Sequence, residues 1–177
     1  TMGGKNLQSI VTKIFVQLCA KIGGVPWAIN DLPFAFEYPT MIVGLNHHKK
    51  SGVAFGLYTM MATMDATATI YWPEFAEGSA AFTFVNFIEK NLPLAIEAFQ
   101  KRTTVLPQYM VVYEEGVSRG EQGRILEQEI EVFKRVLREK AVTAGRACRL
   151  IFVASAKTQT VKMFYNEITG DFEYRTI

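Results

Sequence analysis

Cysteine and histidine are scarce in this chain, and their scarcity excludes several kinds of metal site. The 177 residues contain two cysteines, Cys19 and Cys148, and two histidines, His47 and His48. The cysteines lie far apart and form no CxxC pair, whereas a structural zinc site needs about four ligands at close spacing. The histidines are adjacent, so on an extended chain they point to opposite faces and do not share a metal ion. We expect both cysteines to be reduced thiols in the core of an intracellular protein.

Long apolar runs and a strong net charge are also missing. No run reaches the roughly 18 apolar residues of a membrane span, and no charged-then-apolar signal segment opens the chain. Lys and Arg number 19 against 17 Asp and Glu, a formal charge of +2, so any basic surface for nucleic acid must be local. These absences favour a cytoplasmic or nuclear protein with no membrane partner.

The composition is that of one globular domain. Hydrophobic residues make up 49% of the chain and charged residues 20%, and this length suffices to bury a core. Residues 1–4, TMGG, resemble a vector-derived remnant and are set aside. The sequence therefore predicts a single domain over residues 5–177.

Hydrophobic periodicity predicts three helices. The first covers residues 7–22, and its apolar face is expected to lie buried in the core. The residues of that face are Ile10, Val11, Ile14, Phe15, Leu18 and Ile22. Two more helices are predicted over residues 79–102 and 121–140, the second with a solvated face and ion pairs such as Glu131 with Arg135.

β-rich runs lie between these helices. They predict strands over residues 40–45, 52–63, 66–72, 108–116, 148–156 and 160–167. The first three are sequential, which is typical of an antiparallel meander, and the later alternation of strand and helix implies parallel strands with crossover helices. The predicted fold is α/β: a mixed sheet in which a meander is followed by a βαβαβ unit, with flanking helices.

Polar side chains stand at the ends of two predicted strands. The run IVGL is followed by Asn46, and YMVVY is followed by Glu114 and Glu115. Ligands collect at the carboxyl ends of parallel strands, and Mg²⁺ prefers oxygen ligands such as carboxylates. Alone, Glu114 would be a solvated charge, but Glu114, Glu115 and a third acid such as Asp65 could also form a nuclease metal site.

Four segments, in order and spacing, resemble the Piwi domain of the Argonaute/Piwi family. They are KIFVQLCAKIGGVPW (13–27), MIVGLNHHKKSG (41–52), YMVVYEEGVSRGEQ (109–122) and RLIFVASAKTQTVKMF (149–164). Gln17 and Lys21 ahead of Gly-Gly resemble the Piwi branch more than the Argonaute branch. The resemblance implies a ribonuclease H-like fold and a guide-directed RNA slicer that works beside a MID-like domain.

Slicing in that family uses two aspartates, a late Asp or His and a mobile glutamate. The resemblance places the first aspartate at Asn46, the second at Glu115 and the mobile glutamate near Thr83. The late position lies beyond Ile177, which implies a C-terminally incomplete domain. None of these positions holds the residue that slicing requires.

These departures weaken the metal site that slicing requires. Asn46 carries no charge, so much of the attraction that holds Mg²⁺ is lost. Glu115 is one methylene longer than aspartate, and a misplacement of about 1 Å can cost about 100-fold in rate. We expect Asn46 and Glu115 to be vestigial positions, with Mg²⁺ bound weakly and no cleavage. A Mg-dependent ribonuclease with altered ligands, or a protein-interaction domain that retains the fold, are the alternatives.

Side chains near both ends of the chain match positions that contact the guide RNA in the family. Lys13, Gln17 and Lys21 are spaced by four and share one helix face. The resemblance assigns Gln17 and Lys21 to the 5′-phosphate of the guide, and Lys157 and Lys162 to its backbone. Lysine suits these contacts, since phosphates carry most nucleic-acid affinity.

The expected partners follow from the same resemblance. They are a small guide RNA, its target RNA and a MID-like domain. A sheet left open by an incomplete domain also predicts self-association through its uncovered face or edge.

Overall fold

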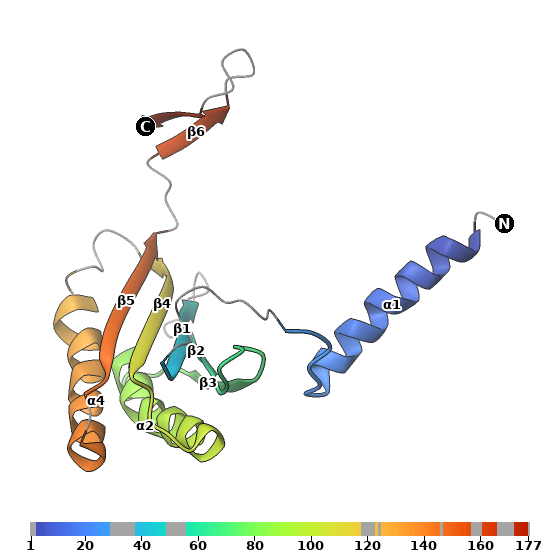
Figure 1. Ribbon diagram of the computed structural model, residues 1–177. Helices are drawn as coiled ribbons and strands as arrows, with labels where there is room; N and C mark the ends of the chain where they lie inside the picture. The colour runs from blue at the N-terminus through green and yellow to red at the C-terminus, as the bar shows by residue number, and fades with distance from the viewer. Residues whose placement is uncertain are drawn as a thin grey trace.

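A mixed five-stranded sheet forms the centre of the protein (Figure 1). The computed structural model describes residues 3–28, 38–48, 56–117, 123, 125–145, 147–156, 161–165 and 172–176. The strands are β1 (Thr40–His48), β2 (Leu57–Thr63), β3 (Tyr71–Glu77), β4 (Tyr109–Val117) and β5 (Arg149–Ala156), in the spatial order β3-β2-β1-β4-β5. β1, β2 and β3 pair antiparallel, while β1, β4 and β5 pair parallel. The predicted meander and parallel half are confirmed.

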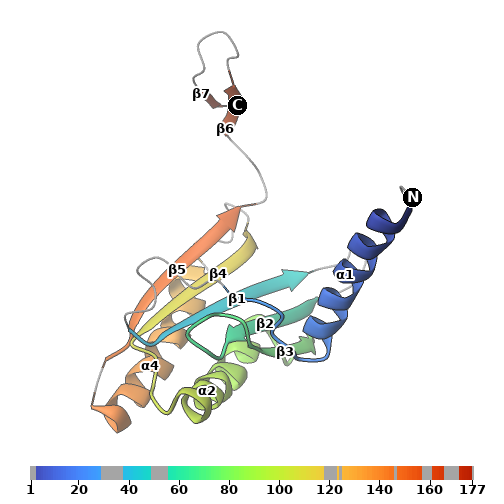
Figure 2. The same cartoon turned by 45° about the vertical axis from the view of Figure 1, so that its right-hand side comes forward.

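Two helices cover one face of this sheet (Figure 2). Helix α2 (Phe84–Thr103) connects β3 to β4, and α4 (Ile130–Ala144), preceded by the π-helical turn η2 (Ile125–Glu129), connects β4 to β5. Fully buried side chains between sheet and helices include Met41, Val43, Met60, Phe87, Leu92, Phe99, Met110, Val112 and Phe133. Each such side chain contributes about 1.5–3 kcal/mol, so the core lies on this face.

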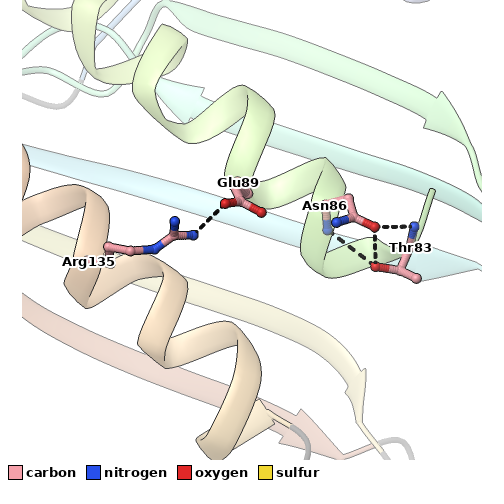
Figure 3. Close-up of polar contacts among 4 residues, drawn as sticks. All are labelled: Thr83, Asn86, Glu89 and Arg135. Carbon is pink, nitrogen blue, oxygen red and sulfur yellow. Dashed lines mark hydrogen bonds and ion pairs between the residues drawn. The ribbon is translucent and has the colours of Figure 1, made fainter. Parts of the chain in front are cut away.

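Helix α2 begins where a threonine side chain caps it (Figure 3). The Oγ1 of Thr83 accepts from the backbone N–H of Asn86 at 3.3 Å, and the Oδ1 of Asn86 accepts from the backbone N–H of Thr83 at 3.0 Å. This capping box satisfies two backbone donors that the first turn leaves open. The predicted start at residue 79 was wrong, because Ser79 pairs with Phe82 as a β-bridge instead.

The turn between β2 and β3 is organised by Asp65. Its Oδ1 accepts from the backbone N–H groups of Thr69 at 3.0 Å and Ile70 at 2.9 Å, and its Oδ2 accepts from the hydroxyls of Thr67 and Thr69. Partial burial raises the pKa of Asp65, but these hydrogen bonds outweigh it and hold the pKa below its usual value. The strand predicted over residues 66–72 was therefore wrong in its first five positions, since a local aspartate turn competes with strand pairing.

Helix α1 (Gly3–Lys21) projects away from the sheet (Figure 1). The side chains of its predicted apolar face are exposed rather than buried, from 51% for Ile10 to 78% for Ile22, which follows the last helical residue. The prediction that this face enters the core was wrong, because the described part of the chain leaves that face of α1 uncovered. No described helix is long and apolar enough to cross a membrane.

Ion pairs connect the outer sides of α2 and α4. Arg135 donates to Glu89 at 2.6 Å (Figure 3) and Lys140 to Glu97 at 2.8 Å. Glu131 pairs with Lys134 at 2.6 Å, so the predicted pairing with Arg135 was wrong. Exposed pairs of this kind fix orientation more than they add stability.

The remaining strands form a separate hairpin. β6 (Val161–Tyr165) and β7 (Phe172–Thr176) pair antiparallel as a two-stranded sheet. A strand near residues 160–167 is confirmed, and β7 was not predicted. Of the strand predicted over residues 52–63, the part from Leu57 onward is β2, and residues 52–55 lie outside the described residues.

Candidate functional site at the carboxyl ends of β1 and β4

Asn46 and Glu115 are brought together by the parallel pairing of β1 and β4. They are register partners, and the Nδ2 of Asn46 donates to the Oε2 of Glu115 at 3.3 Å. Because side chains alternate along a strand, both point to the side opposite the buried Leu45 and Glu114. We call the sheet surface turned away from α2 and α4 the open face. The two positions predicted as vestigial catalytic residues thus form one contact on the open face.

The backbone carbonyl oxygen of Asn46 also has a hydrogen-bond partner. Thr59, the register partner of Asn46 on β2, donates its hydroxyl to the Asn46 backbone oxygen at 3.4 Å. Sequence reasoning did not single out Thr59. Its signal was available only from the register, which the sequence alone does not fix.

The pair does not form a good magnesium site. It offers one carboxylate and one neutral amide, whereas a two-metal site is built from several carboxylates. Among the residues that the structure describes, no group of three or more His, Cys, Asp or Glu side chains is placed to hold a metal ion. These residues therefore do not fit the two-metal chemistry of a slicer.

Glu114 faces the other way. It is 3% exposed and lies on the same side of β4 as the fully buried Met110 and Val112. The prediction of a solvated strand-end charge was wrong, because strict alternation turns Glu114 toward the helices. Glu114 and Glu115 lie on opposite faces of the sheet and do not share an ion.

Asp65 lies at the far end of the sheet from Glu115. Ala62 is the register partner of Val43, so continuing this register places Asp65 level with the amino end of β1, six residue steps and about 20 Å from Asn46. Its carboxylate is engaged by the turn described above. The alternative prediction of a metal site formed by Glu114, Glu115 and Asp65 was therefore wrong, because these side chains do not lie together.

The two histidines follow the alternation expected of them. The ring of His47 stacks on Phe84 at 5.5 Å between centroids and meets Tyr58 edge-on at 5.3 Å. His48 is exposed. His47 thus packs against the helix-covered face, on the side opposite Asn46.

Thr83, near which the resemblance places the mobile glutamate, is the N-cap residue of α2. Thr83 offers no carboxylate, and its hydroxyl caps α2. Its place in the fold is structural.

The predicted guide-binding residues are only partly described. Gln17 and Lys21 are exposed on the last turns of α1, one turn apart and on one face. Gln17 also lines a cavity of about 590 Å³ between α1 and the β2–β3 turn. Lys157 lies outside the described residues, and Lys162 lies on β6, where its side chain is not described.

Solved Argonaute and Piwi proteins share this fold. The N. crassa QDE-2 MID-PIWI domains match with a TM-score of 0.72 at 15% identity, over 87% of this chain and 45% of that one. Drosophila Piwi matches with a TM-score of 0.67 at 23% identity, over 98% of this chain and 22% of that one. The sheet and its helices therefore define a ribonuclease H-like fold of the Argonaute class.

The sequence comparison narrows that class. The Piwi domain model matches residues 2–174, and the chain belongs to the Piwi domain family. Siwi from Bombyx mori is 26% identical over 166 residues, 92% of this chain and 18% of the relative. Protein piwi from Drosophila melanogaster is 27% identical over 169 residues, 94% of this chain and 20% of the relative. The chain thus spans about a fifth of the length of these relatives.

Proposed function

We propose that this chain is the guide-binding part of a small-RNA-guided silencing protein and does not cleave its target. Family membership supports the small-RNA role. The lack of cleavage is argued from the Asn46–Glu115 contact, in which a neutral amide stands where the resemblance places one of the two aspartates. A single carboxylate there attracts Mg²⁺ much less than a carboxylate pair.

The proposed guide contacts lie on α1 and around β6. Lys21 and Gln17 would hold the 5′-phosphate together with a MID-like domain, and Lys157 and Lys162 would contact the backbone. The sequence of α1 contains three lysines, Lys5, Lys13 and Lys21, and no acid. That local positive charge supports phosphate binding despite the small net charge of the chain. The target RNA would pair with the guide, and Mg²⁺ would have no catalytic role.

RNA binding tests the first half of this proposal. We expect the chain to bind a 5′-phosphorylated RNA more tightly than the same RNA with a 5′-hydroxyl, measured by fluorescence anisotropy. Lys21→Glu should remove at least a tenfold preference. Lys90→Glu is the matched control, because it makes the same change of charge at an exposed lysine on α2, away from the proposed contacts on α1. Equal affinity for both RNAs, unaffected by Lys21→Glu, would count against guide binding.

Target cleavage tests the second half. With a phosphorylated guide, a complementary target and millimolar Mg²⁺ or Mn²⁺, we expect intact target on a denaturing gel. Guide-dependent products that vanish in Glu115→Ala would instead establish the ribonuclease alternative.

The protein-interaction alternative has its own supporting observation. Large apolar side chains are exposed on α1 and on the open face of the sheet. A chain that binds neither RNA but associates through these surfaces would favour that alternative. The self-association expected from the sequence would use the same exposed surfaces, so it belongs to this alternative.

A further inference from the structure

A row of four polar side chains crosses the open face of the sheet at the carboxyl end of β1. Its members are register partners on adjacent strands: Thr59 on β2, Asn46 on β1, Glu115 on β4 and Ser155 on β5. Side chains of register partners point to the same face of a sheet, so all four stand on the open face. Neighbouring strands are about 4.8 Å apart, which makes the row about 14 Å long. We call these four residues the polar row.

The polar row marks a change in the character of this face. Two residues earlier along each strand, the same face carries Met61, Gly44, Tyr113 and Val153, again as register partners. That neighbouring row holds no charged or amide side chain. The change to polar groups therefore falls at the carboxyl ends of the parallel strands, where ligands collect.

The central pair of the polar row presents a donor beside an acceptor. Within the described residues, one N–H of the Asn46 amide is used by the Oε2 of Glu115, at 3.3 Å. An amide has two N–H groups and a carboxylate has two oxygens, so one N–H and one oxygen are left for a ligand. A hydroxyl group matches both, because it accepts one hydrogen bond and donates another.

The ends of the polar row have hydroxyl groups of their own. Thr59 donates its proton to the backbone oxygen of Asn46 at 3.4 Å, so its oxygen can accept from a ligand. Ser155 is exposed beside Glu115, and its hydroxyl rotates to donate or to accept. The row contains no positive side chain, and the Glu115 carboxylate repels phosphate. Its chemistry therefore suits neutral hydroxyl groups rather than phosphates.

Hydroxyl groups of this kind distinguish RNA from DNA. When a target is paired with a guide, the pairing edges of its bases are occupied. The wide, shallow minor groove of an A-form duplex presents the ribose 2′-hydroxyls, which DNA lacks. The proposed guide contacts lie on α1 and around β6, which leaves the target strand for the carboxyl end of β1.

We propose that the polar row binds 2′-hydroxyl groups of the target strand and thereby selects RNA over DNA targets. At its centre, the Asn46 N–H donates to a 2′-oxygen, and the Glu115 carboxylate accepts the proton of the same hydroxyl. An aspartate at position 46 would lack this donor and would add a second charge. The inference rests on the proposed function, because it needs a guide-paired target.

Binding of matched RNA and DNA targets tests the inference. The chain is loaded with a 5′-phosphorylated guide RNA, and its affinity for labelled targets of one sequence is measured by fluorescence anisotropy in EDTA. Glu115→Ala should lower the RNA-to-DNA affinity ratio about tenfold, and Asn46→Ala about threefold, as expected for hydrogen bonds to charged and neutral groups. The ratio is the readout because removing Glu115 also weakens the repulsion of both backbones. Comparison with wild type cancels the different strengths of the two duplexes.

A control variant separates the contact from general charge. Glu77 is exposed at the end of β3, three strands from Glu115. Glu77→Ala should change the affinities for RNA and DNA alike and leave their ratio as in wild type. Glu115→Gln keeps an acceptor oxygen, so its ratio should fall between those of wild type and Glu115→Ala. Circular dichroism confirms the folding of each variant.

A 2′-deoxy scan locates the contact. RNA targets with a single 2′-deoxynucleotide should bind wild type more weakly at one or two adjacent positions only. This position dependence should disappear in Glu115→Ala. The same substitutions in the guide should produce no local loss.

Four results would overturn the inference. An unchanged ratio in both Asn46→Ala and Glu115→Ala, with the preference for 5′-phosphorylated RNA intact, would overturn it alone. A uniform loss along the scan would show that duplex geometry is read, and a local loss confined to the guide would assign the contact to the other strand. Absence of guide binding by the wild-type chain would overturn the proposed function as well.

Discussion

Asn46 and Glu115 are joined by a side-chain hydrogen bond across two parallel strands, from Nδ2 to Oε2 over 3.3 Å. The contact replaces the mutual repulsion of two carboxylates with a donor and an acceptor. The strand ends therefore need no cation between them, and the fold around the site should be stable without metal.

The first prediction concerns the charge at this position. Asn46→Asp places two carboxylates in one register pair, so the midpoint of thermal unfolding at pH 7 should fall by several degrees in EDTA. Millimolar Mg²⁺ should restore part of the loss, because the ion neutralises the new pair. Wild-type protein should show no Mg²⁺ dependence, and Asn46→Ala, which adds no charge, should be the metal-insensitive control. A wild-type midpoint that rises with Mg²⁺ would contradict this reading of the site.

The proximity of Asn46 and Glu115 could be predicted from the sequence. Apolar runs located β1 and β4, and helices between later strands implied that the strands are parallel, so their polar ends meet at one edge. The inward orientation of Glu114 could be predicted in the same way, because alternation from the buried Met110 and Val112 turns its side chain toward the helices. The error there came from treating a charged residue as necessarily solvated.

Other features depend on information that periodicity does not contain. The apolar pattern of α1 predicts a helix with one covered face, but the pattern does not say which molecule supplies the cover. The segment after β2 is rich in Thr and Ala and has strand propensity, yet the Asp65 carboxylate competes for its backbone donors. Local hydrogen bonds, rather than strand propensity, determine the structure of that segment.

The second prediction follows from that turn. Asp65→Ala removes the acceptor of four hydrogen bonds and should lower the free energy of unfolding by about 2 kcal/mol. Urea denaturation measures the loss, and Asp65→Asn, which keeps one acceptor oxygen, should lose less. An unchanged denaturation midpoint in Asp65→Ala would show that the turn does not depend on the carboxylate.

The sign of the pH effect is fixed by the lowered pKa of Asp65. The carboxylate stabilises the fold above its unfolded pKa of about 3.9. That contribution declines as the pH falls from there through the folded pKa. The difference in stability between wild type and Asp65→Ala should therefore shrink in acid, and a constant difference would argue against an ionised acceptor.

The third prediction tests the role of Thr83. Thr83→Ala should cost about 1 kcal/mol of unfolding free energy because α2 loses its N-cap. Thr83→Ser keeps the hydroxyl and should retain most of the stability. RNA binding by the folded Thr83→Ala variant should equal that of wild type, and a selective loss of RNA binding would point to a functional role at this position.

The fourth prediction concerns Cys148. Burial raises the pKa of its thiol to about 11, and only the thiolate reacts with alkylating reagents. At pH 8 about one molecule in a thousand carries the thiolate, so iodoacetamide should label Cys148 slowly. The rate should rise about tenfold per pH unit while the chain stays folded, and unfolding in urea at pH 8 should accelerate labelling. Peptide mass spectrometry separates Cys148 from Cys19, and rapid labelling of folded Cys148 at pH 8 would contradict the raised pKa of this half-buried thiol.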